Sequence, residues 1–230
     1  MVLSMLGIGN ISNAQIWRKV AEDLTSDSKD LSKEDAVAGI KEALIQGTTK
    51  SVNLVSEVDG YFKNPEIKIP FPPEAKTIED KLRMVGLGGE VDKVVLSINR
   101  AAEDAATEVK PIFIAAIKDM SISDALDIVN GNNHAATNYL QKKTTRDITK
   151  KIKPLIENSL EKVNATKYWD DIIHSYNSIP FVKKMNPDLS EYVTEMAIEG
   201  MFIMIAKEEE KIRKDPLART TELLERVFGK

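Results

Sequence analysis

The sequence predicts an all-α protein, a single multi-helix bundle of about eight helices around a central apolar helix near residues 189–206. Apolar residues recur at three- and four-residue spacing along most of the chain. No stretch shows the sustained alternation of a half-buried strand, and no strand–helix–strand rhythm supports a nucleotide-binding sheet. A chain of 230 residues can bury one sizeable core. We therefore expect a single helical domain over residues 34–229, preceded by a leader and linker over residues 1–33.

The leader and linker differ from the rest of the chain. Residues 1–14 are mildly apolar and end in Ser-Asn-Ala, which has the form of a signal-peptidase site. Two glycines and an asparagine interrupt this apolar stretch, and the first cation is Arg18. We therefore expect a poorly ordered leader or a trimmed export segment. Residues 22–35 carry six acids against two lysines and favour a solvated linker.

Glycine, proline and capping residues mark the expected helix ends. Pro111 and Pro154 are expected to break or interrupt the helical pattern. Four prolines between residues 61 and 73 favour an extended loop with at most one short edge strand. The expected helices cover residues 34–57, 73–85, 89–109, 112–120, 122–130 behind a Ser121/Asp124 capping box, 135–163, a stretch around Trp169, 189–214, and a terminal helix after Asp215-Pro216.

The helix over 189–214 is expected to lie inside the bundle. Residues 196–206 are apolar on all sides except for Glu199, and such a segment is typical of a buried helix. A carboxylate carried inward would need a partner, and Arg100 is the cation that we expect. Residues 207–214 are rich in opposite charges four positions apart, which favours an exposed helix end.

A polar cluster beside these apolar stripes provides the first site candidates. The simplest interpretation is a buried ion pair that fixes the register of two helices. The alternatives are a polar floor to a ligand cavity, or a general acid or base. The candidates are Asn99, Arg100, Glu103 and Glu199.

A basic ridge provides the second set of candidates. Six cations between Gln141 and Lys153 oppose one aspartate. Four of them share a helical face opposite the apolar stripe: Lys142, Arg146, Lys150 and Lys153. A solvated helix face is the simplest interpretation, and an anionic membrane surface or an acidic protein partner is the alternative. We expect no nucleic acid partner, because the net charge is −4 and aromatic residues for stacking are lacking here.

Signatures of common chemistries are missing from the sequence. It has no cysteine, which excludes disulfides, thiolate metal sites, a cysteine nucleophile and a lipidated cysteine. The glycines of residues 86–89 follow an expected helix and therefore predict a turn instead of a phosphate loop. Residues 130–134 favour a capping turn over an anion site, and Asp170 with His174 favours a surface pair over a metal site. We expect no cofactor, no metal and no catalytic residue, and we lean against an enzyme.

Composition also limits the environment of the chain. It is 42% apolar and 30% charged, and no apolar run reaches the ~20 residues of a membrane helix. A soluble globular protein is therefore expected.

Six strings taken together resemble one known family. The chain is similar, over about residues 34–229, to the bacterial family known as domain of unknown function 4197. The resemblance implies an all-helical domain without an established activity, frequently preceded by an export or lipoprotein leader. It carries over no catalytic residue, and the leader departs from it in lacking a basic region and a cysteine. The strings are Gly39–Leu44, Asp59–Pro65, Ser97–Glu103, Ala135–Tyr139, Asp188–Met204 and Arg219–Leu224.

Two functions of different classes follow. The first is a non-catalytic binding or scaffolding protein of the bacterial cell envelope, which offers an interhelical cavity or the basic ridge to a partner. The second is a hydrolase-like enzyme or small-ligand binder that uses the polar cluster. Convergence of the four cluster residues on an open pocket favours the second, and a closed pair opposes it.

Overall fold

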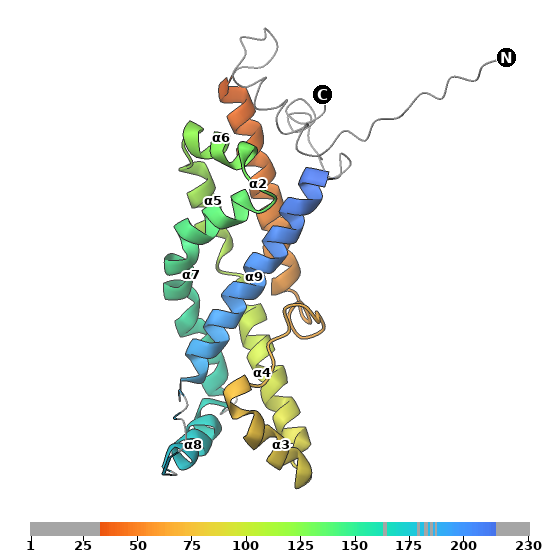
Figure 1. Cartoon of the computed structure of the whole chain (residues 1–230), viewed down its shortest axis with the longest axis vertical. Coiled ribbons are helices and arrows are strands. Elements are labelled where there is room, and N and C mark those ends of the chain that lie inside the picture. The colour runs from red at the N-terminus through yellow and green to blue at the C-terminus, as the bar shows by residue number, and fades with distance from the viewer. Residues whose placement is uncertain are drawn as a thin grey trace, which may run out of the picture.

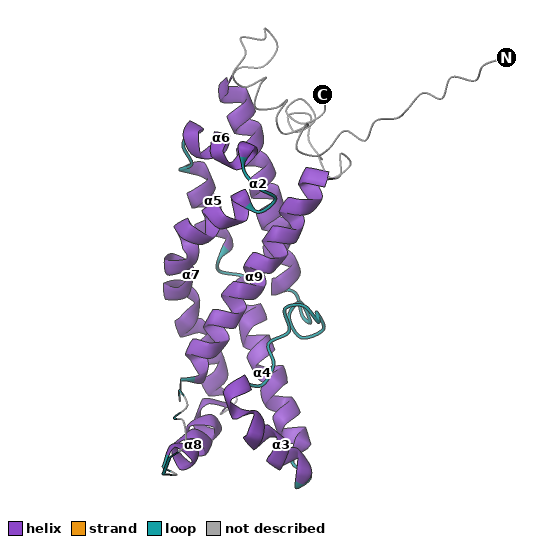
Figure 2. Ribbon diagram, in the orientation of Figure 1, coloured by secondary structure: helices purple, strands orange, loops and turns teal. Residues whose placement is uncertain are grey.

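The computed structural model describes residues 33–162, 165–178, 180–181, 184, 186 and 188–214. These residues form eight α-helices and one 3-10 turn, and they contain no strand (Figure 2). The predicted all-α fold is confirmed. The elements are α2 (Lys33–Ser56), η1 (Pro73–Ala75), α3 (Lys76–Met84), α4 (Gly88–Ala106), α5 (Lys110–Lys118), α6 (Ile122–Asn130), α7 (Ala135–Lys162), α8 (Ala165–Asn177) and α9 (Leu189–Lys214).

Two expectations fall on residues outside this description. The leader and linker lie there except for their last residue, Lys33, which begins α2. The terminal helix expected after Asp215-Pro216 also lies there. Among the described helices, none combines the length and the apolar character that a bilayer crossing requires.

The helices form an elongated bundle with α9 running through its middle (Figure 1). α9 packs mainly on α7 and α2, and it also contacts α4 and α8. Val193, Ala197 and Met201 are buried on it, but Glu195 and Glu199 are exposed. The helix therefore packs on the bundle with one face open to solvent, and the expectation of a helix buried on all sides is wrong. α3 and α8 lie at one end of the bundle, and α6 lies at the other with the start of α2 (Figure 1).

The two helix-breaking prolines behave differently. Pro111 lies in the first turn of α5, where its missing N–H would have had no helical partner, so the expected break is confirmed. Pro154 lies inside α7, which continues through it, so the expected interruption is wrong. Ile152 and Ile156 are fully buried on either side of Pro154. Burial of this apolar face offsets the one hydrogen bond that the proline removes.

The α2–η1 loop, residues 57–72, crosses the bundle without forming a strand. Tyr61, Ile67, Ile69 and Phe71 are buried apolar residues of this loop. The Tyr61 hydroxyl donates to the Ala197 carbonyl at 2.6 Å, and burial raises the pKa of Tyr61. A Cβ at Gly200 would lie 2.7 Å from Tyr61 Cε1, so the glycine lets the loop approach α9.

Asp188 caps the N-terminus of α9. Its Oδ1 accepts from the Glu191 backbone N–H at 2.9 Å, and its Oδ2 accepts from Lys153 Nζ at 2.8 Å. Burial by itself would raise the pKa of Asp188, but hydrogen bonds from Lys153, Ser190 and Glu191 outweigh burial and lower it to about 2. The charged form therefore stabilises the fold above the ordinary pKa of 3.8, and this contribution is lost as the pH falls through about 2.

We expect Asp188→Ala to lower the free energy of unfolding by about 1 kcal/mol at pH 7, the usual cost of a lost N-cap. The loss is expected to shrink at pH 2, where the native carboxylate takes up a proton. Urea denaturation at both pH values measures this difference, and Asp127→Ala, which removes an exposed carboxylate on α6, is the control. An equal loss at both pH values would contradict the assigned role of Asp188.

Candidate functional site

Asn99 on α4 is fully buried and binds the backbone of the α2–η1 loop. Its Oδ1 accepts from the Ile69 N–H at 2.9 Å. Its Nδ2 donates to the Ile69 carbonyl at 2.7 Å and to the Val95 carbonyl at 2.7 Å. The side chain therefore satisfies both backbone groups of Ile69, as a neighbouring strand would do.

Glu103 lies one turn further along α4 and is also buried. Its Oε1 accepts from the backbone N–H groups of Tyr61 at 3.0 Å and Phe62 at 3.1 Å. Its Oε2 accepts from Arg100 Nη1. Both carboxylate oxygens are thus engaged inside the protein.

Arg100 completes the group at the edge of the bundle. Its Nη2 donates to Asp59 Oδ1, and its guanidinium lies 5.5 Å from the centre of the Phe62 ring. Hydrogen bonds from Lys63 and Arg100 lower the pKa of Asp59, and the same contact with Asp59, together with Glu103, raises the pKa of Arg100. We call Asn99, Arg100 and Glu103 the loop clamp, because their contacts hold the α2–η1 loop on α4.

Glu199 does not join this group, so the expected inward position and the Arg100–Glu199 pair are wrong. The Glu199 side chain is exposed on α9. Glu195, one turn earlier, is exposed as well, whereas Gly200 and Met201 face inward. The outward face keeps the carboxylate hydrated and avoids the cost of burying its charge. The polar cluster therefore closes without Glu199, and no general base remains free in it.

The buried ion pair of α9 is instead Glu209–Arg213, which corrects the expectation of a wholly exposed end over residues 207–214. The two side chains are 7% and 3% exposed at the residue level. Arg213 Nη2 lies 2.7 Å from Glu209 Oε1 and also donates to the Ile128 carbonyl at 3.0 Å. The signal was present, since Glu209 and Arg213 continue at four-residue spacing the face that buries Ile205.

Glu209 also caps α7. Its oxygens accept from the backbone N–H of Ala136 at 3.0 Å and of Thr137 at 2.9 Å. These amides are therefore unavailable to an anion, and residues 130–134 act as the expected turn. His134 and His174 are both exposed, and the described residues contain no group of three or more potential metal ligands.

Only three of the four cations of the basic ridge are free of ion pairs within the described residues. Lys142, Arg146 and Lys150 are exposed on α7, and within the described ranges none of the three has an ion-pair partner. Lys153, by contrast, is engaged with Asp188 at 2.8 Å. The open ridge is therefore Lys142, Arg146 and Lys150.

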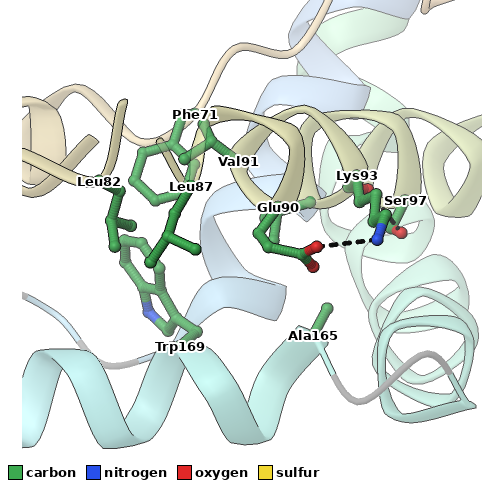
Figure 3. Close-up of a pocket in the computed structure, with 10 residues that line it drawn as sticks. Phe71, Leu82, Leu87, Glu90, Val91, Lys93, Ser97, Ala165 and Trp169 are labelled. Carbon is green, nitrogen blue, oxygen red and sulfur yellow. Dashed lines mark hydrogen bonds and ion pairs between the residues drawn. The ribbon is translucent and has the colours of Figure 1, made fainter. Parts of the chain in front are cut away.

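A cavity that the sequence did not predict lies between α3, α4 and α8, and we call it the α4–α8 cavity. It has a volume of about 430 Å³. Figure 3 shows Trp169 and Ala165 of α8 facing Leu82, Leu87 and Glu90 across it. Its walls are mostly apolar, and its polar groups come from one face of α4. The lining residues are Phe71, Leu82, Leu87, Glu90, Val91, Lys93, Val94, Ser97, Ala165 and Trp169.

α8 carries two unpartnered polar side chains, of which Trp169 lines the cavity and Thr166 does not. Across the described residues, the buried side-chain polar atoms without a hydrogen-bond partner are Thr166 Oγ1 and Trp169 Nε1. Both belong to α8 and lie three positions apart, which places them on adjoining parts of one helix face. The Trp169 ring meets Phe71 edge to face, with 5.6 Å between centroids. The ring is thus held by apolar packing while its N–H is left unsatisfied.

The fold and these residues define an all-α bundle, and the α4–α8 cavity is one of several small-molecule-sized pockets among the described residues. The chain belongs to the family described as "Protein of unknown function (DUF4197)", whose model matches residues 30–229. No curated protein matches the chain, and no solved structure matches it either.

We expect Glu103→Ala to lower the free energy of unfolding by about 3–5 kcal/mol, because it leaves Arg100 and two backbone N–H groups without their buried acceptor. Glu199→Gln is the matched control and is expected to change it by less than about 0.5 kcal/mol. Urea denaturation of both variants tests the loop clamp. A Glu103→Ala variant as stable as Glu199→Gln would refute it.

Proposed function

We propose that this protein is a non-catalytic binding module whose binding site is the α4–α8 cavity. The observation that carries the proposal is an apolar chamber of about 430 Å³, which lies within the size range of small-ligand pockets. A buried tryptophan forms one wall of it. Large aromatic surfaces of this kind contribute much of the affinity in apolar sites.

The approach to the cavity is also apolar. Leu87 lines the cavity and is 47% exposed, and Val85 and Met84 in the same α3–α4 turn are 70% and 85% exposed. Adjoining exposed apolar side chains are typical of a surface that meets a ligand or partner. Leu87 therefore links the cavity lining to an exposed apolar stretch of the chain.

The hydrolase-like alternative receives less support. It requires a free acid or base among Asn99, Arg100, Glu103 and Glu199, whereas the loop clamp engages the first three and Glu199 lies apart. The cell envelope remains the proposed location, on the export leader that the family resemblance implies.

We expect the full chain to bind the fluorescent apolar probe N-phenyl-1-naphthylamine, with a rise in probe fluorescence. Val94→Phe fills the cavity and is expected to weaken binding about tenfold or more. Leu96→Phe adds the same ring on α4 outside the cavity lining and is expected to change the affinity by less than about twofold. Circular dichroism verifies that both variants fold. Absence of probe binding, or equal binding by Val94→Phe, would overturn the proposal.

A second proposed function is association with an anionic membrane surface through the open ridge. It is favoured by three exposed cations at four-residue spacing that have no ion-pair partner within the described ranges. Each cation near an anionic bilayer contributes about 1 kcal/mol, and salt screens this attraction.

Sedimentation with vesicles of phosphatidylglycerol and phosphatidylcholine measures this association. Lys150→Glu is expected to weaken binding about tenfold, because it replaces one attraction by a repulsion. Lys81→Glu on α3 makes the same change of charge away from the ridge and is expected to have little effect. Binding that does not weaken with salt, or that responds equally to both variants, would exclude the ridge as the contact.

A further inference from the structure

We propose that the turn between α3 and α4 inserts into the surface of a lipid bilayer and is a membrane-contact site of this protein. Met84, Val85 and Leu87 are its exposed large apolar residues, and we call them the apolar tip. The inference goes beyond the proposed functions, because it needs neither a ligand in the cavity nor the open ridge. Three features of the turn lead to it: its side chains, its backbone and its charges.

The apolar tip lies at one end of the bundle. Figure 1 shows the α3–α4 turn at the end that also holds α8. Three large apolar side chains within four residues face solvent there. Phe181, which lies shortly after the end of α8, is fully exposed as well. Exposed apolar groups that gather at one place are typical of a surface that meets another apolar surface.

The backbone of the turn is already hydrogen-bonded within the protein. Gly86 has a φ of 83° and ends α3 in a Schellman motif. A bilayer offers no water to backbone amides, so a turn enters it at low cost only when its N–H groups have internal partners. The α3–α4 turn meets this requirement. The N–H groups of Val85, Gly86 and Leu87 donate to the carbonyls of Lys81, Arg83 and Leu82 at 3.1, 3.1 and 2.9 Å.

The charges beside the apolar tip also suit a lipid surface. All four acids within residues 76–93 are paired with cations, which reduces their repulsion of lipid phosphates. Lys81 is exposed, and across the described part of the chain it has no ion-pair partner. Its long side chain can reach a phosphate while the tip lies deeper. The pairs are Lys76–Asp80, Glu79–Arg83, Arg83–Asp92 and Glu90–Lys93.

A bilayer fits this surface better than a second protein does. Stable protein interfaces bury about 800 Å² on each partner, with about 20–30 residues a side. The apolar tip and Phe181 offer four apolar side chains on two separate connections, which is too few for such an interface. Shallow insertion needs only a few apolar side chains, because binding scales with the apolar area that enters the lipid. Since Leu87 also lines the α4–α8 cavity, insertion brings that cavity to the bilayer surface.

A fluorescent label tests the insertion. The chain has no cysteine, so Val85→Cys accepts a nitrobenzoxadiazole label at a single position. The full chain is mixed with vesicles of phosphatidylglycerol and phosphatidylcholine at about 0.5 M salt, which screens the attraction of the open ridge. We expect the emission to rise about twofold or more as the label leaves water, and spin-labelled lipid to quench it. Val58→Cys is the matched control, because Val58 is 78% exposed outside the tip, and its label is expected not to respond.

A charge variant tests the same contact without a label. Val85→Asp is expected to weaken sedimentation with these vesicles about tenfold or more, because a carboxylate resists transfer into lipid. Val58→Asp makes the same exchange away from the tip and is expected to change binding less than about twofold. Circular dichroism verifies that both variants fold.

Three results overturn the inference. The first is a label at position 85 that does not respond to vesicles, or that responds no more than the label at position 58. The second is vesicle binding that disappears at high salt and depends only on Lys150, which supports the open ridge alone. The third is self-association without lipid, measured by analytical ultracentrifugation, that Val85→Asp abolishes, because the tip then contacts a second copy of the chain.

Discussion

The requirement that buried polar groups find partners organises this structure. Asn99 and Glu103 are buried because they replace water at the backbone of the α2–η1 loop. Glu209 does the same for the start of α7, with Arg213 beside it. Asn99, Glu103 and Glu209 each accept hydrogen bonds from backbone N–H groups that would otherwise be buried without a partner. The bundle can therefore pack against the inner face of α9 although four buried side chains in the protein, Asn99, Glu103, Glu209 and Arg213, are charged or carry an amide.

The same requirement distinguishes the residues that hold the fold together, such as the loop clamp, from the proposed binding site at the α4–α8 cavity. In the loop clamp, Asn99, Arg100 and Glu103 are engaged with the loop, and Arg100 also pairs with Glu103. On α8 the requirement is not met, because the N–H of Trp169 and the hydroxyl of Thr166 are covered without partners. Trp169 lines the cavity between α3, α4 and α8. Unmet hydrogen bonding next to apolar space is a reason to look for a ligand there.

Local signals made much of the fold predictable. The Ser121/Asp124 capping box and the four-residue spacing of apolar residues act within one helix, so the sequence contains them directly. The errors concern relations between helices. An apolar run that contains one acid does not show which side of the helix faces the solvent. The structure places Glu199 on the exposed side. Opposite charges four residues apart give the same sequence pattern whether the pair is buried or exposed to solvent. In this structure Glu209 and Arg213 are buried. The cavity joins the consecutive helices α3 and α4 to α8, which comes much later in the chain, so no single stretch of sequence predicts it.

The indole N–H resonance of Trp169 tests the central claim most directly. In a Trp17→Phe background, ¹H–¹⁵N correlation spectra contain a single indole signal from the full chain. We predict that N-phenyl-1-naphthylamine moves the Trp169 Hε1 signal, because Trp169 lines the α4–α8 cavity, and that Val94→Phe abolishes this movement. A signal that stays in place at saturation, or that moves equally in the Val94→Phe variant, would contradict the account.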